Sequence, residues 1–133
     1  MKELEIGRIL VSELESDGWT CVQNKAGKKG AGGIDIILVR NEETFGIECK
    51  GDSKANRVDF LTLLGQSAIM KSEHNLTHNA ICISEKYIKY CQKHAKTLKA
   101  LGLLIYIVDD EGCFYRYFDA DEERQNDPAP IYT

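Results

Sequence analysis

The chain has 133 residues, of which 43% are hydrophobic and 29% are charged. This is an ordinary balance for one globular domain with its own core. Seventeen Lys and Arg against 21 Asp and Glu give a net charge of −4, which excludes a protein that binds nucleic acid through a strongly basic total charge. No apolar run reaches the ~18 residues of a membrane span, and residues 1–8 lack the apolar segment of a signal peptide. We therefore expect a cytoplasmic protein with no membrane segment.

The cysteines indicate a reduced protein. There are five of them, an odd number, and no CxxC pair occurs. Cys21, Cys49 and Cys82 stand inside apolar runs, where cysteine usually acts as a small buried hydrophobic residue. This usage fits a reducing compartment better than a disulfide framework.

Hydrophobic periodicity and turn residues divide the chain into alternating helices and strands. In chain order the predicted elements are a helix at 3–17, strands at 19–23, 34–39 and 44–50, a helix at 57–72, a strand at 79–83, a helix at 86–101, and strands at 103–108 and 113–118. The order αβββαβαββ predicts an α/β fold with a mixed central sheet flanked by helices, antiparallel in the hairpin and parallel across the crossover helices.

Two apolar runs and the C-terminal segment refine this expectation. The continuous runs at 34–39 and 103–108 predict central strands that are buried on both faces. Residues 1–120 are expected to form one domain. Residues 121–133 contain both prolines and four of the 21 acidic residues, and they are expected to form a loosely ordered tail.

The hairpin predicted at 34–50 brings charged residues together. Alternation along the second strand places Glu48 and Lys50 on one face. If the hairpin folds about residues 41–42, residue 35 lies opposite residue 48 or 49. Asp35 is the charged residue of an otherwise apolar strand, so we expect its carboxylate beside that of Glu48.

Two like charges facing each other across a ladder destabilise a sheet unless a cation offsets them. Two carboxylates suit a hard divalent cation such as Mg²⁺, with positions left for water and phosphate. Such a cation lowers the pKa of a bound water and polarises a phosphoryl oxygen, and Lys50 can orient that water or stabilise the developing charge. The arrangement predicts metal-dependent phosphodiester hydrolysis. The alternative is a plain ion pair between Lys50 and either carboxylate at the end of a strand.

Gly33-Ile34-Asp35, followed by Ile47-Glu48-Cys49-Lys50, resembles the signature of the PD-(D/E)XK superfamily, which includes restriction endonucleases and Holliday junction resolvases. The αβββαβ core of that superfamily matches the first six predicted elements in order. Residues 79–109 are similar to the C-terminal half of Mrr-type restriction endonuclease domains. The resemblance covers roughly residues 3–118 and departs from the signature at Ile34, which stands where proline gives the motif its name.

The resemblance implies a residue-level assignment of the site. It implies that Asp35 and Glu48 are metal ligands, that the backbone carbonyl of Cys49 is a further ligand, and that Lys50 is the catalytic lysine. The implied cofactor is Mg²⁺ or Mn²⁺.

The resemblance also implies two positions on helices. Many members of the superfamily complete the metal shell with a glutamate from the first helix, and Glu5 is the first candidate here, with Glu3 as runner-up. Many also carry a glutamine on the helix after the second strand of the hairpin, in a QxxxY pattern. Gln66 fits that place, although Met70 stands where the tyrosine belongs. The alternative for each is a solvent-facing helical side chain.

Two short basic segments are candidates for contact with DNA phosphates. They comprise Lys25, Lys28 and Lys29 in the glycine-rich loop, and Lys54 and Arg57 after the hairpin. The loop sequence GKKGAGG matches neither a dinucleotide-binding fingerprint nor a P-loop.

A zinc site is disfavoured by the sequence. It would require His74 and His78 to converge with Cys91 and His94, and two histidines at the end of a surface helix are far commoner.

These observations predict a divalent-metal-dependent endonuclease acting on DNA. A domain of this size supplies one active site, so cutting both strands predicts a homodimer with two-fold symmetry. One alternative is a nuclease fold without turnover that binds nucleic acid or a partner protein. Another is a structure-selective resolvase of the Holliday-junction type.

Overall fold

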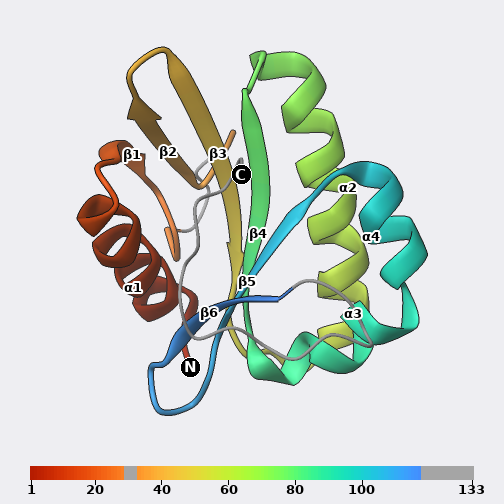
Figure 1. Ribbon diagram of the computed structural model, residues 1–133. Helices are drawn as coiled ribbons and strands as arrows, with labels where there is room; N and C mark the ends of the chain where they lie inside the picture. Colours follow the sequence, from red (N-terminus) through yellow and green to blue (C-terminus); the bar gives the residue numbers. More distant parts are fainter. Residues whose placement is uncertain (29–32, 118–133) are drawn as a thin grey trace.

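The centre of the molecule is a six-stranded mixed sheet with helices on both faces (Figure 1). This computed structural model describes residues 1–28 and 33–117. In chain order the elements are α1 (Glu3–Ser16), β1 (Thr20–Asn24), β2 (Ile36–Arg40), β3 (Glu43–Lys50), α2 (Asn56–His74), β4 (His78–Ser84), the short 3-10 turn η1 (Glu85–Tyr87), α3 (Ile88–Lys93), α4 (Ala95–Leu101), β5 (Leu104–Val108) and β6 (Phe114–Tyr117). The predicted α/β class and the αβββαβ order of the core are confirmed.

The strands lie side by side in the order in which they occur in the sequence. β1, β2 and β3 are antiparallel to one another, β3, β4 and β5 run parallel, and β6 returns antiparallel to β5. In the β2–β3 hairpin, Ile36 pairs with Ile47 and Arg40 with Glu43. The short loop between β2 and β3 forces the antiparallel pairing, whereas α2 and the α3–α4 segment supply the crossovers that parallel strands need.

The sheet separates two hydrophobic cores. On one face α1 packs Ile6, Leu10 and Leu14 against β2, β3 and β4. On the opposite face α2 contributes Phe60 and Leu63 to a second core, which α3 and α4 complete together with the side chains of β4 and β5. Alternation along β3 therefore sends Phe45, Ile47 and Cys49 toward α1, and Glu48 toward the α2 side.

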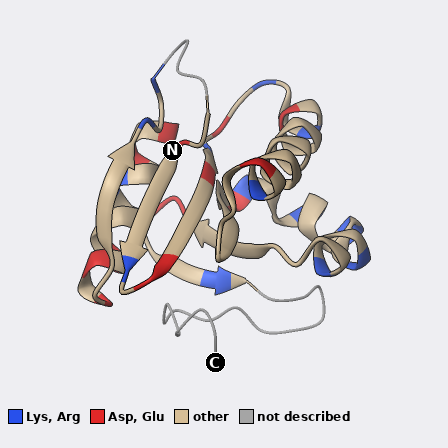
Figure 2. Cartoon of the chain, turned by 90° about the horizontal axis from the view of Figure 1, so that it is seen from above, with Lys and Arg blue, Asp and Glu red and all other residues tan. Residues whose placement is uncertain are grey.

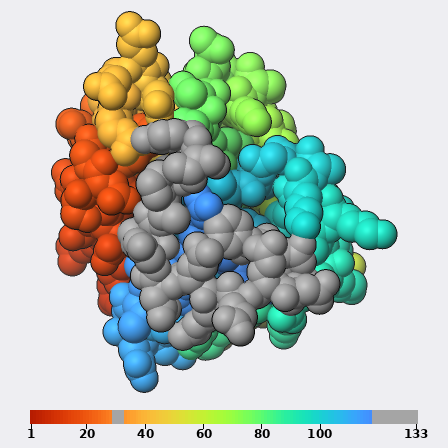
Figure 3. All heavy atoms as spheres, viewed as in Figure 1, coloured from red at the N-terminus to blue at the C-terminus, as the bar shows by residue number. Residues whose placement is uncertain are grey.

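One end of the sheet carries the β2–β3 turn and the α2–β4 connection, and the other carries the end of β3 and the start of α1. At one end the β2–β3 turn and the α2–β4 connection project beside each other (Figure 3), and Thr77 donates its backbone N–H to the carbonyl of Thr44 at 2.9 Å. β3 and β4 start near this end and run toward the other, where β3 finishes at Lys50 and α1 begins. Asp35, Glu48 and Lys50 thus lie toward the end of the sheet where β3 finishes.

Three sequence expectations need correction. β2 is not a central strand with both faces buried: it is second from the edge and alternates buried and half-buried residues, because α2 packs over β3 and β4 rather than over β2. Asp35 stands just before β2 instead of inside it. The helix expected at 86–101 is divided into η1, α3 and α4. Its backbone leaves helical geometry at His94, whose ring stacks on Phe60 of α2 with centroids 6.3 Å apart.

The tail expected at 121–133 lies outside the described residues, and so does the end of the domain expected at residue 120. Within the described ranges, no helix combines the length and the apolar character needed to cross a membrane.

Candidate active site

Asp35 and Glu48 come together at the start of β2. Continuing the β2–β3 register by one residue beyond the Ile36–Ile47 pair places Asp35 across from Glu48, as the hairpin argument expected. The Asp35 side chain is half-buried, and its Oδ2 accepts a hydrogen bond from the backbone N–H of Cys49 at 2.9 Å. Its main-chain carbonyl accepts a second one from Lys25 at 2.6 Å. The residue is therefore held from two sides: β3 binds its carboxylate and the segment after β1 binds its main chain.

Glu48 is the buried carboxylate of the pair. The residue is 4% exposed, and its Oε1 has no hydrogen-bond partner among the residues that the structure describes. Burial, followed by the negative charge of Asp35, raises the pKa of Glu48 from 4.5 to about 8. A buried carboxyl group with an unsatisfied oxygen is costly unless a proton or a cation compensates it.

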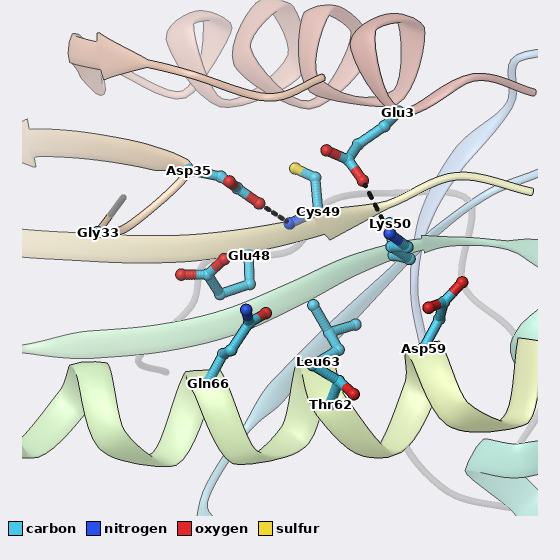
Figure 4. A pocket seen from close by; sticks show the side chains of 10 residues that line it. All are labelled: Glu3, Gly33, Asp35, Glu48, Cys49, Lys50, Asp59, Thr62, Leu63 and Gln66. Atoms are coloured by element: carbon cyan, nitrogen blue, oxygen red, sulfur yellow. Dashed lines mark hydrogen bonds and ion pairs between the residues drawn. The ribbon is translucent and has the colours of Figure 1, made fainter. Parts of the chain in front are cut away.

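Lys50 closes the site at the end of β3. Its Nζ lies 3.7 Å from Oε1 of Glu3 (Figure 4), while Oε2 of Glu3 accepts a hydrogen bond from the backbone N–H of Gly27 at 2.9 Å. The start of α1 is held here by main-chain packing. Asp52 N–H donates to the Met1 carbonyl at 2.9 Å, and a Cβ at Gly51 would lie 2.4 Å from the Glu3 nitrogen. Gly51 therefore allows the close approach that brings Glu3 to Lys50.

On α1 the structure selects Glu3 rather than Glu5. Glu3 is half-buried and lines the cavity, whereas Glu5 is exposed and does not. Two residues on an α-helix are separated by about 200° of rotation, so both glutamates cannot face the same site. Glu5, the first candidate from the sequence, is thus replaced by the runner-up.

The wall opposite β3 is the first half of α2. Gln66 lines the cavity, as the sequence suggested, and Asp59 and Thr62 join it. The Ser53 hydroxyl donates to Asp59. Sequence reasoning missed Asp59 and Thr62, yet they lie seven and four positions before Gln66, the spacing that places helical residues on one face.

These walls enclose a cavity of about 180 Å³, several times the roughly 30 Å³ that one water occupies in the liquid. Figure 4 shows Asp35, Glu48 and Lys50 on one side and Gln66 and Asp59 on the other. The space suits a hydrated cation together with one phosphate group.

The donor set fits Mg²⁺ or Mn²⁺ better than zinc. Among the described residues, no group of three or more His, Cys, Asp and Glu side chains is placed to hold a metal ion. Mg²⁺ needs no such cage, because it keeps several waters and binds through one or two carboxylates. A hydrogen bond with Cys82, together with burial, holds the pKa of the Cys49 thiol well above its usual range. Cys49 would therefore bind a metal ion through its backbone carbonyl oxygen rather than through a thiolate.

None of the expected DNA-binding residues that the structure describes lines this cavity. Lys25 follows β1, and its backbone N–H donates to the carbonyl of Asp35. Lys28 is exposed and follows Gly27, whose N–H donates to Glu3. Lys54 and Arg57 are exposed before and within the first turn of α2. Lys29 lies outside the described residues.

A larger basic surface was overlooked in the sequence. α3 and α4 contain no Asp or Glu, and Figure 2 shows blue at this side of the molecule, where four lysines are exposed: Lys89, Lys93, Lys96 and Lys99. The lack of any acidic residue between Lys86 and Val108 could have revealed this surface in the sequence.

Comparison with known proteins supports the fold. No protein-family model and no curated protein matches the sequence. An XisH family protein from Nostoc punctiforme PCC 73102 superimposes with a TM-score of 0.54 at 19% identity, covering 82% of this chain and 91% of its own. An FdxN element excision controlling factor protein from Anabaena variabilis gives 0.54 at 17% identity, covering 80% of this chain and 92% of its own. At such low identity the likeness shows a common fold and nothing more.

Proposed function

We propose that the chain is a divalent-metal-dependent endonuclease of the PD-(D/E)XK type that hydrolyses phosphodiester bonds in DNA. The proposal rests on the buried Glu48 carboxyl group, whose Oε1 lacks a hydrogen-bond partner among the described residues and which has Asp35 beside it. A divalent cation between the two carboxylates would both satisfy that oxygen and offset the repulsion.

The chain's own residues divide the chemistry among them. Asp35, Glu48 and the Cys49 carbonyl would hold Mg²⁺ or Mn²⁺, which supplies a water of lowered pKa and polarises the phosphate. Lys50 orients the attacking water and stabilises the developing charge, and its ion pair with Glu3 sets the position of its ammonium group. Gln66 lines the same cavity from α2, and its side-chain amide can bind the attacking water or a phosphate oxygen.

Two observations favour DNA as the substrate. One structural neighbour is described as an FdxN element excision controlling factor, and excision of an element is a process that acts on DNA. The second observation is the set of exposed lysines on α3 and α4, which gives a chain of negative net charge a positively charged surface that can bind phosphate groups. Such a surface binds nucleic acid through charge even when the net charge of the protein is negative.

The test is a cleavage assay on labelled linear, branched and single-stranded DNA with Mg²⁺, Mn²⁺ or EDTA. We expect cleavage with either metal and none with EDTA. Asp35→Asn and Glu48→Gln should abolish cleavage, while Glu42→Gln, an exposed carboxylate in the β2–β3 turn, should retain it. Cleavage that persists in EDTA, or in Asp35→Asn, overturns the proposal. Preference for the branched substrate would identify a resolvase.

The second candidate is a catalytically silent module that binds nucleic acid or a partner protein. The same neighbour favours it, because that protein is described as a controlling factor and not as a nuclease. For this candidate we expect DNA binding without cleavage under every metal condition, and equal binding by wild type and Asp35→Asn.

A further inference from the structure

The outer face of α2 carries exposed hydrophobic residues. Five large hydrophobic side chains among the described residues are exposed, and three of them belong to this helix: Val58 at 63%, Leu61 at 45% and Ile69 at 53%. The opposite face of the same helix buries Phe60 and Leu63 in the core. Apolar residues scattered singly on a surface are ordinary, whereas a concentration on one helix marks a contact surface.

Two of these three side chains, Leu61 and Ile69, belong to a ridge of residues spaced by four, which we call the α2 ridge: Arg57, Leu61, Gly65, Ile69 and Glu73. Gly65 is its midpoint. Leu61 and Ile69 each lie four positions from Gly65, and Arg57 and Glu73 each lie eight. A two-fold axis that passes Gly65 perpendicular to α2 makes the two helices antiparallel, and it therefore brings leucine beside isoleucine and arginine beside glutamate. The ridge is complementary to a second copy of itself, as an isologous interface requires.

Helix geometry permits this contact. Ridges of residues spaced by four are inclined to the helix axis, and two such ridges run alongside each other when the helices cross at about 50°. The point of closest approach needs a small residue. A Cβ built on Gly65 meets no heavy atom within 4 Å, so nothing from the described residues covers this position.

The charges of the α2 ridge favour a second copy of this chain, rather than a different protein, as its binding partner. Arg57 and Glu73 are both exposed, and the structure shows no ion pair for either of them within the described residues. Pairing across the two-fold axis would create two identical Arg–Glu contacts at the rim of an apolar centre, the usual layout of a protein interface.

We propose that two copies of the chain pair through the α2 ridge, crossing at Gly65 around a two-fold axis. Thr62 and Gln66 line the cavity from the same helix, each one position from a ridge residue. The dimer therefore sets two cavities on either side of its axis. This consequence rests on the proposed function, because only a nuclease would use two sites to cut both strands.

The first test is the mass in solution of the full chain, in EDTA and without DNA. Wild type should sediment as a dimer of the 15.0 kDa chain. Leu61→Asp and Ile69→Asp should each give a folded monomer. Its melting temperature should be close to that of wild type at a concentration low enough for the wild-type dimer to dissociate. Val22→Asp is the matched control, since Val22 is 58% exposed on β1, and this variant should remain a dimer.

A charge exchange tests the proposed pairing of residues. Arg57→Glu and Glu73→Arg should each weaken the dimer, and the double variant should restore it, because the axis pairs one position with the other. Gly65→Leu should weaken the dimer by filling the crossing point, although its side chain meets open space in the single chain.

The outcomes separate this inference from the proposed function. A wild type that is monomeric at every concentration overturns the pairing and leaves the ridge to a different protein partner. A dimer that survives both aspartate substitutions places the interface elsewhere and overturns it as well. A dimer that depends on the ridge but cleaves no DNA confirms the pairing and refutes the nuclease. A monomer that nicks DNA does the reverse.

Discussion

The Nζ atom of Lys50 lies 3.7 Å from Oε1 of Glu3, so the residue that ends β3 is tied to the first turn of α1. This ion pair joins two segments that are 47 positions apart and sets one wall of the cavity. Glu3 holds the ammonium group of Lys50 in place, whereas Glu5 is exposed and does not line the cavity.

Glu3→Gln should reduce cleavage, because the ammonium group of Lys50 loses its charged partner and the hydrogen bond from Gly27 weakens. Glu5→Gln on the same helix should leave cleavage unchanged. Initial rates on the same DNA, measured at equal metal concentration, compare the two variants. Equal rates would mean that Glu3 is an ordinary surface residue.

A divalent metal should stabilise the folded protein through Asp35 and Glu48. A ligand present at 100 times its dissociation constant adds ~2.7 kcal/mol to the free energy of unfolding. Mg²⁺ or Mn²⁺ should therefore raise the melting temperature of wild type, and Asp35→Asn or Glu48→Gln should remove that rise. Thermal unfolding with a series of metal concentrations measures the effect. A rise that survives in both variants would place the metal elsewhere.

The stability of the metal-free protein should fall with increasing pH. Burial beside Asp35 raises the folded-state pKa of Glu48 from 4.5 to about 8, so in this interval the folded protein holds a proton that the unfolded chain has released. The stabilisation is complete below pH 4.5 and is lost as the pH rises through about 8. Glu48→Gln should remove this loss, which urea unfolding in EDTA at several pH values can measure. An equal slope in both proteins would show that Glu48 is not protonated in the folded state.

Lys50→Ala should separate metal binding from catalysis. The variant lacks a positive charge beside the two carboxylates, so the metal should bind at least as tightly as in wild type. Cleavage should nevertheless fall by about 10²–10³-fold, the range seen when a group that stabilises transition-state charge is removed. Isothermal titration calorimetry with the metal measures its affinity, and initial cleavage rates measure catalysis. Cleavage at the wild-type rate would leave Lys50 as a structural partner of Glu3.

The lysines on α3 and α4 should contribute to DNA affinity through charge. Replacing Lys93 and Lys96 with glutamine should weaken binding to all DNA sequences alike. It should also lower the slope of log affinity against log salt by about 0.9 for each phosphate that the protein no longer neutralises. Arg8→Gln, an exposed cation on α1, serves as the control. Fluorescence anisotropy in EDTA measures binding without cleavage, and an unchanged slope would remove this surface from the DNA-binding site.

The sequence by itself determined the order of elements and the hairpin. The short turn narrowed the partner of residue 35 to residue 48 or 49, and alternation in residues 44–50 favoured Glu48, since a shift of one position would turn every apolar side chain of the strand outward. Asp35 and Glu48 could therefore be brought together from local pattern alone. Gln66 was implied by the resemblance to the PD-(D/E)XK superfamily, through its place on the helix after the hairpin.

Only the tertiary structure decided which helical residues complete the site. The choice between Glu3 and Glu5 depends on how α1 is rotated against the sheet, and that rotation is set by the packing of Ile6 and Leu10 and by the approach of Gly51 to the helix start. The burial of Glu48 likewise depends on α2 packing over β3. Local periodicity describes which residues share a face of one element. The direction in which that face points is set by contacts between residues far apart in the chain, and these are fixed only when the elements pack together.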